Sequence, residues 1–169
     1  WWAHQVIGAN VQGCVMMSEA LAQYSSVMVM EKEYGKMQVG KFLKHELSSY
    51  LMGRGSESIK EQPLYLVENQ QYIHYNKGAI TMYALRDYCG EKAVNRALSQ
   101  YLKATAFQQP PYTNSLEFMQ YIEPIVPDSI SYIVDDWFRK ITLYDNELLS
   151  VESSQISKRE YEVTMKLKT

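Results

Sequence analysis

Apolar residues recur at spacings of three and four along most of this chain, and glycine or proline interrupts each such stretch. This spacing is typical of amphipathic helices. The helices predicted in this way cover residues 15–34, 37–52, 70–88, 91–106, 115–123 and 128–139. Gly35 and Gly90 are placed to end two of them. Pro110 and Pro111 would break a third, and Asp128 is a candidate N-cap. The chain is therefore expected to be mainly α-helical.

The pattern changes after about residue 140, where apolar and polar residues alternate. Alternation from Tyr161 to Leu167 is typical of a half-buried strand. The predicted strands cover residues 141–151 and 161–168, on either side of a polar stretch. We therefore expect a helical part over residues 1–140, followed by the opening strands of a β-domain over residues 141–169.

Charge and cysteine content exclude several classes of function. Lys and Arg total 17 against 19 Asp and Glu, so the chain has no excess of basic residues for nucleic acid, and no nucleic-acid partner is expected. Its apolar runs are shorter than the ~18–20 residues of a membrane span, so this segment is expected to be soluble. Cys14 and Cys89 lack the spacing of a metal site. Two free thiols are the simpler interpretation, and a single disulfide stays open.

One apparent metal-binding motif is incomplete. His45 and Glu46 begin like the zinc motif HExxH, but Ser49 stands where the second histidine belongs. The motif works because imidazoles four residues apart on a helix face one metal ion. His45 is therefore interpreted as a surface or packing residue. His4 and His74 show no ligand spacing to it or to each other.

Two segments carry more information because of their order along the chain. The first is WWAHQ at 1–5 running into MSEALAQY at 17–24, and the second is YIHYNKGA at 72–79. Together they resemble the aminopeptidase N family of gluzincins, which are zinc metallopeptidases. In that family an HExxHQW helix is followed by a helix with an N-E-G-F-A-x-Y type motif, whose Glu is the third zinc ligand. A later Y-x-K-G-A segment supplies a tyrosine that stabilises the transition state.

The resemblance covers residues 1–140 and assigns two site residues. It implies that Glu19 ligates zinc and that Tyr75 is catalytic, and the interval of 56 positions between them is close to the family's. Ser18 and Ala20 stand where the family usually has Asn and Gly. The implied fold is the helical C-terminal subdomain of a thermolysin-like catalytic domain.

The resemblance also implies the chemistry and the setting of a longer parent protein. Trp1 and Trp2 would directly follow an HExxHQ segment, so the chain looks like an excised part of a zinc-dependent aminopeptidase that hydrolyses peptides. Glu19 alone would be one ligand, so no zinc and no activity are expected in this chain by itself. Similarity is greatest to a bacterial branch joined to ABC transporter permeases, in which VIGANVQG (6–13) and VMEKEYG (29–35) are typical. The parent would then be membrane-associated.

Plainer interpretations stay open beside this one. Glu19 near a helix start could simply favour the helix dipole and face solvent, and Tyr75 could be packed in an aromatic cluster with Tyr72 and Tyr83. The chain could also be a catalytically silent helical interaction or scaffold module attached to a membrane transporter. If the chain is part of a peptidase domain, we expect a partly exposed apolar surface that the missing half of the domain would cover, and this surface would allow self-association.

Overall fold

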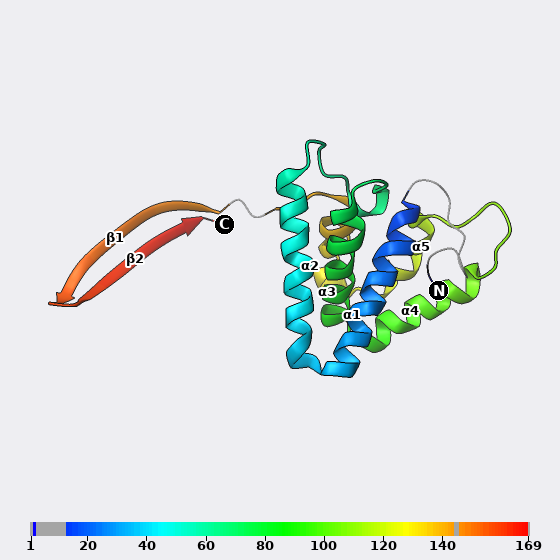
Figure 1. The fold of residues 1–169 in the computed structure, drawn as a ribbon, viewed down its shortest axis with the longest axis horizontal. Helices are drawn as coiled ribbons and strands as arrows, with labels where there is room; N and C mark the ends of the chain where they lie inside the picture. Colours follow the sequence, from blue (N-terminus) through cyan, green and yellow to red (C-terminus); the bar gives the residue numbers. More distant parts are fainter. Residues whose placement is uncertain (1, 3–12, 144–145, 169) are drawn as a thin grey trace.

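The computed structural model describes residues 2, 13–143 and 146–168, and it consists of helices followed by one two-stranded antiparallel sheet (Figure 1). His4 and residues 6–12 of the VIGANVQG segment lie outside the described residues. The α-helices are α1 (Leu21–Tyr34), α2 (Lys36–Ser56), α3 (Gly78–Cys89), α4 (Glu91–Thr105), α5 (Ser115–Ile122) and α6 (Tyr132–Val134). Within the described part of the chain, none of the helices combines the length and the apolar character needed to cross a bilayer.

Three π-helical turns adjoin these helices. They are η1 (Met16–Ala20) before α1, η3 (Tyr72–Lys77) before α3, and η6 (Asp135–Arg139) after α6. Three short 3-10 turns complete the helical part: η2 (Leu64–Leu66), η4 (Glu123–Ile125) and η5 (Asp128–Ile130). The π turns were not predicted, because one wide turn hardly disturbs the apolar spacing of a helix.

Most of the predicted helix boundaries are confirmed. Gly35 and Gly90 end α1 and α3 with φ of +84° and +87°, a backbone conformation that favours glycine. α2 runs four residues further than predicted, to Ser56. The N-cap prediction for Asp128 is wrong: Pro127 occupies the cap in an extended conformation, and Asp128 is already the first residue of η5.

The helices pack around a core formed mainly by α1, α3, α4 and α5, with α2 lying against α1 and η3. Val94, Leu98 and Tyr101 of α4 are buried, as their spacing predicts. The spacing of apolar residues on α2 predicts a buried stripe formed by Phe42, Leu43, Leu47, Tyr50 and Leu51. This prediction is partly wrong, because Leu47 and Leu51 are 47% and 55% exposed. α2 instead buries a face formed by Val39, Glu46 and Tyr50. A buried glutamate on this face demands hydrogen-bonding partners.

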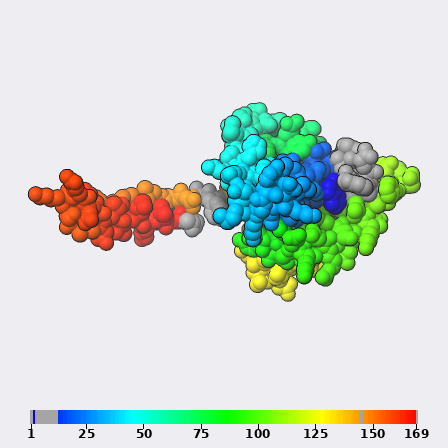
Figure 2. Space-filling model, turned by 60° about the horizontal axis from the view of Figure 1, so that its bottom comes forward, coloured from blue at the N-terminus to red at the C-terminus, as the bar shows by residue number. Residues whose placement is uncertain are grey.

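The two strands, β1 (Glu147–Ser157) and β2 (Glu160–Lys168), form a hairpin that projects away from the helices (Figures 1 and 2). β1 begins six residues later than predicted and continues through the polar stretch. Tyr161, Val163, Met165 and Leu167 share one face, but each is more than half exposed, so the half-buried prediction is wrong for the described residues. No described element covers that face, and a lone two-stranded hairpin is marginally stable in water.

Candidate functional site

Glu19 and Tyr75 lie side by side, although 56 positions separate them in the sequence. Glu19 belongs to η1 and Tyr75 to η3, and these two π turns pack against each other. Both side chains are half-buried. The pKa of Tyr75 is raised above its ordinary value, first by hydrogen bonding of its hydroxyl with the Glu19 carboxylate and then by burial. Single π turns inside helices occur frequently at functional sites.

A close contact between two small residues sets the separation of these turns. Ala20 follows Glu19, and Gly78 lies three positions after Tyr75. A Cβ atom added to Gly78 would lie 2.4 Å from the Cβ of Ala20, far inside van der Waals contact. The two backbones can therefore approach this closely only because position 78 is glycine.

Replacing Gly78 by Ala is expected to destabilise the fold by about 1–3 kcal/mol, the usual cost of overfilling a packed site. The clash should outweigh the ~0.5–1 kcal/mol by which Ala is preferred to Gly inside a helix. Urea unfolding of this chain measures the difference. The double variant Ala20→Gly with Gly78→Ala moves the methyl group to the other helix and should recover most of the loss. Equal stability of Gly78→Ala and the original chain would show that the contact is not tight.

A buried carboxylate on α2 links the helices that carry Glu19 and Tyr75. Glu46 is 4% exposed. Its Oε1 accepts a hydrogen bond from Nε2 of Gln23 at 2.7 Å, and its Oε2 accepts one from Nδ2 of Asn76 at 2.6 Å. Gln23 lies one helical turn after Glu19, and Asn76 is the neighbour of Tyr75. In the sequence, Glu46 stands out only as part of the incomplete HExxH motif. Its position on one helical face with Val39 and Tyr50, at spacings of seven and four, was the signal that could have revealed its burial.

A second buried carboxylate holds the other side of η3. Glu61 accepts hydrogen bonds from Nζ of Lys77 and Nε of Arg54, both at 2.6 Å, and from the Tyr50 hydroxyl at 3.1 Å. Its side chain is 3% exposed. Asn76 and Lys77 are thus tied to two different buried carboxylates, so the turn that presents Tyr75 is fixed on both sides.

His74 is the buried neighbour of Tyr75, with the two ring centroids 4.8 Å apart. Burial lowers the pKa of His74 below its ordinary value, and the nearby Glu19 carboxylate opposes this effect. The Nδ1 atom of His74 has no hydrogen-bond partner among the described residues. His45 is exposed, as predicted for a surface residue.

Potential metal ligands around Glu19 are few in the described part of the chain. Glu19 can offer one carboxylate, but the described residues contain no group of three or more His, Cys, Asp or Glu side chains that could hold a metal ion. A catalytic zinc takes three protein ligands. A zinc site with three protein ligands at Glu19 would therefore need at least one ligand from outside the described residues. Cys14 and Cys89 are both free and half-buried, which matches the thiol interpretation and leaves no disulfide.

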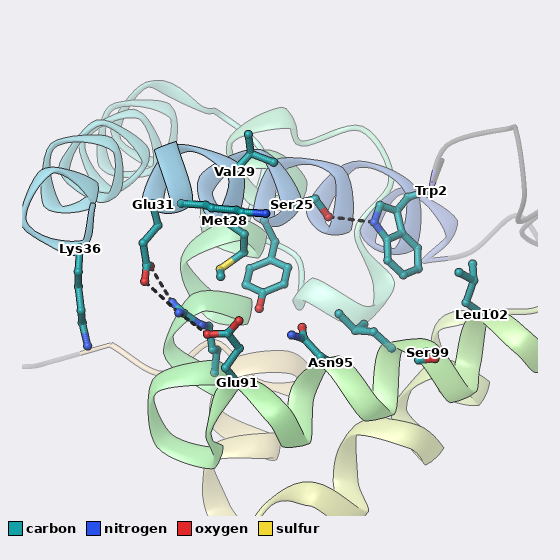
Figure 3. Close-up of a pocket in the computed structure, with 14 residues that line it drawn as sticks. Trp2, Ser25, Met28, Val29, Glu31, Lys36, Glu91, Asn95, Ser99 and Leu102 are labelled. Carbon is teal, nitrogen blue, oxygen red and sulfur yellow. Dashed lines mark hydrogen bonds and ion pairs between the residues drawn. The ribbon is translucent and has the colours of Figure 1, made fainter. Parts of the chain in front are cut away.

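A separate groove of about 680 Å³ lies between α1 and α4 (Figure 3). Its lining includes Met28, Leu98 and Leu102 but neither Glu19 nor Tyr75. At one end the Glu31 carboxylate accepts two hydrogen bonds from Arg86, at 2.7 and 2.9 Å. Figure 3 shows the Trp2 indole at the other end, where its nitrogen donates to the Ser25 hydroxyl at 2.9 Å. Because neither Glu19 nor Tyr75 lines it, this groove is separate from the Glu19–Tyr75 arrangement.

No protein-family model, curated protein or solved structure matches this chain. What the chain does must therefore be inferred from its own residues and their geometry. The strongest geometric facts are the packing of the two π turns that carry Glu19 and Tyr75 and the two buried carboxylates, Glu46 and Glu61, that hold the turn around Tyr75.

Proposed function

We propose that this chain is the C-terminal part of the catalytic domain of a zinc-dependent, aminopeptidase-like metallopeptidase that hydrolyses peptide bonds. The observation that carries the proposal is the half-buried Glu19 carboxylate lying against the Tyr75 hydroxyl, on two packed π turns. The thermolysin-like fold and the β-domain begun by the hairpin belong to the same proposal. The proposal also includes a membrane-associated parent protein, because residues 6–13 and 29–35 resemble the permease-fused branch.

Each of the two residues has a role that suits its chemistry. Zinc, when bound, acts as a Lewis acid and lowers the pKa of a bound water. Glu19 offers the carboxylate of a two-histidine, one-glutamate ligand set, whose histidines would come from an HExxH segment preceding Trp1. The Tyr75 hydroxyl can donate a hydrogen bond to the peptide oxygen as negative charge develops on it. With one ligand of three, this chain by itself should be inactive.

The proposal is tested on the longer protein that contains the upstream segment. We expect metal analysis to find one zinc per chain, and we expect cleavage of aminoacyl reporter substrates. Glu19→Gln should weaken zinc binding and abolish cleavage while the protein stays folded, because an amide oxygen is a poorer zinc ligand than a carboxylate. Glu33→Gln, an exposed position on α1, is the matched control and should change neither property. A well-folded longer protein that binds no zinc would refute the proposal.

A silent helical module beside a transporter is the second candidate. Exposed apolar residues on α2 favour it, because Leu47, Leu51 and Met52 offer a surface for another protein or for a second copy of this chain. Ser18 and Ala20, which differ from the peptidase motif, also favour the silent module. The sequence immediately upstream separates the two functions: an intact HExxHQ supports the peptidase, and a lost His or Glu supports the silent module. Sedimentation of this chain as a monomer at high concentration would count against self-association.

A further inference from the structure

We propose that Glu46 is a positioning residue of this site: by accepting hydrogen bonds from Gln23 and Asn76, its carboxylate fixes where Glu19 and Tyr75 lie relative to each other. The inference rests on the proposed function for its catalytic meaning. Its geometric content stands by itself and can be tested without zinc.

The connection to Glu19 runs along one helix face. Gln23 follows Glu19 by four residues on the continuous helix formed by η1 and α1, so the two side chains lie on the same face. The bond from Gln23 to Glu46, at 2.7 Å, therefore anchors this face of α1 to α2. Any rotation of α1 that moves Glu19 must also stretch or break this bond.

The connection to Tyr75 runs through its direct neighbour. Asn76 donates to the other Glu46 oxygen at 2.6 Å, across 30 positions of sequence. A π turn is a rare helical form, so contacts from outside must hold it in preference to a regular turn. Glu46 supplies such a contact beside Tyr75, and it is the same carboxylate that holds Gln23.

The chemistry of the carboxylate suits this double role. An ionised carboxylate only accepts hydrogen bonds, whereas the amide nitrogens of Gln23 and Asn76 only donate them. Glu46 can therefore accept a hydrogen bond from each of the two amides at the same time, one on each carboxylate oxygen. Removing the acceptor would leave two amide groups unpaired next to the site. Because unpaired buried donors are costly, these side chains would rearrange to form other hydrogen bonds. A shift of about 1 Å in a reacting group can already cost on the order of 10²-fold in rate.

The test is nuclear Overhauser spectroscopy on this chain, which reports the distance between the Tyr75 ring protons and the Glu19 side-chain protons. Cross-peaks between them are expected in the original chain. Glu46→Leu keeps the size of the side chain but removes both acceptor oxygens, and the cross-peaks should be lost. Glu46→Gln should retain them. The oxygen of the new amide still accepts one hydrogen bond, and its NH2 group can donate the other to the oxygen of a neighbouring amide that has turned over. Persistence of the cross-peaks in folded Glu46→Leu would overturn the proposal.

Two further variants keep the test decisive. Glu31→Leu removes the carboxylate that joins α1 to Arg86 of α3, about 18 Å along the helix from Glu19. It should lower the melting temperature and yet preserve the cross-peaks, which separates general destabilisation from positioning. If Glu46→Leu does not fold, Asn76→Ala removes only the bond beside Tyr75 and should weaken the same cross-peaks. Unchanged cross-peaks in Asn76→Ala would also overturn the proposal.

In the longer protein, the same Glu46→Leu change should lower kcat with little change in KM, because it misplaces groups that act in the transition state. This measurement depends on the proposed function, whereas the cross-peaks do not. Lost cross-peaks in a longer protein that binds no zinc would support the role of Glu46 in the fold of the site and refute the peptidase. If the longer protein is an active peptidase and the Glu46→Leu variant keeps the cross-peaks, the positioning role of Glu46 is refuted and the proposed function is not.

Discussion

Replacing Tyr75 by Phe is expected to slow peptide hydrolysis by the longer, zinc-containing protein by about 10²- to 10³-fold, the usual cost of losing one hydrogen-bond donor to a developing oxyanion. The ring stays in place, so the packing against His74 is kept. The loss should fall on kcat and leave KM nearly unchanged, because the bond forms only as charge appears on the substrate oxygen. Steady-state kinetics on an aminoacyl reporter measures both constants.

Tyr72→Phe is the matched control for this prediction. Tyr72 belongs to the same π turn, and its hydroxyl accepts a hydrogen bond from Nε2 of Gln70 at 3.1 Å. Tyr72→Phe therefore removes a hydroxyl from η3 without touching Glu19, and kcat should stay close to the original value. Full activity in Tyr75→Phe would assign Tyr75 to packing and not to catalysis.

Replacing Glu61 by Leu is expected to lower the free energy of unfolding by about 3–5 kcal/mol, as is typical when one partner of a buried ion pair is removed. Lys77 and Arg54 would lose their shared carboxylate, and Lys77 is only 15% exposed. The buried Tyr50 hydroxyl would lose its acceptor as well. The Lys77 amine and the Tyr50 hydroxyl would then be left without this partner in a place that water hardly reaches, whereas Arg54 is 35% exposed and can turn to solvent.

Urea unfolding followed by circular dichroism measures this loss. Glu33→Leu provides the control, because Glu33 is exposed on α1 and a surface substitution usually changes stability by no more than about 0.5 kcal/mol. Hydrophobic residues that repack well can replace a whole buried ion pair at little cost. The combination of Glu61→Leu with Lys77→Met should therefore recover part of the stability. A loss for Glu61→Leu no larger than for Glu33→Leu would mean that the cluster contributes little.

The helices were predictable because local signals determine where they begin and end. Gly35 and Gly90 adopt the positive φ that ends a helix, and this preference belongs to glycine itself. The buried face of α2 was less predictable. Leu47 and Leu51 fit an apolar stripe but are exposed, while Glu46 is buried. Which face of a helix is buried depends on the neighbours that cover it, and hydropathy alone does not specify them.

The candidate site was likewise predictable only in part. The order and spacing of two motifs singled out Glu19 and Tyr75, and the structure places these residues together. The groups that hold them, Glu46 and Glu61, lie on other segments. The spacing of Glu46 to Val39 and Tyr50 on α2 is a weak local signal of burial, and the sequence around Glu61 carries none. Their role follows from hydrogen bonds that join positions 7 to 30 residues apart. Sequence patterns can thus nominate reactive groups, whereas the residues that support them become visible only in three dimensions.

The π turn η3 limits how the length of this segment can change during evolution. A π turn closes its hydrogen bonds over five residues instead of four, so it contains one residue more than a regular turn. Deleting one residue between positions 72 and 77 would restore a regular turn and leave the helical segments on its two sides in nearly the same relative rotation, because four α-helical residues and five π-helical residues each complete about one turn. The side chains within the turn would be distributed differently around the helix axis, so the direction in which Tyr75 points depends on the extra residue. Point substitutions can accumulate in this segment, but a single-residue deletion would change where Tyr75 points relative to Glu19.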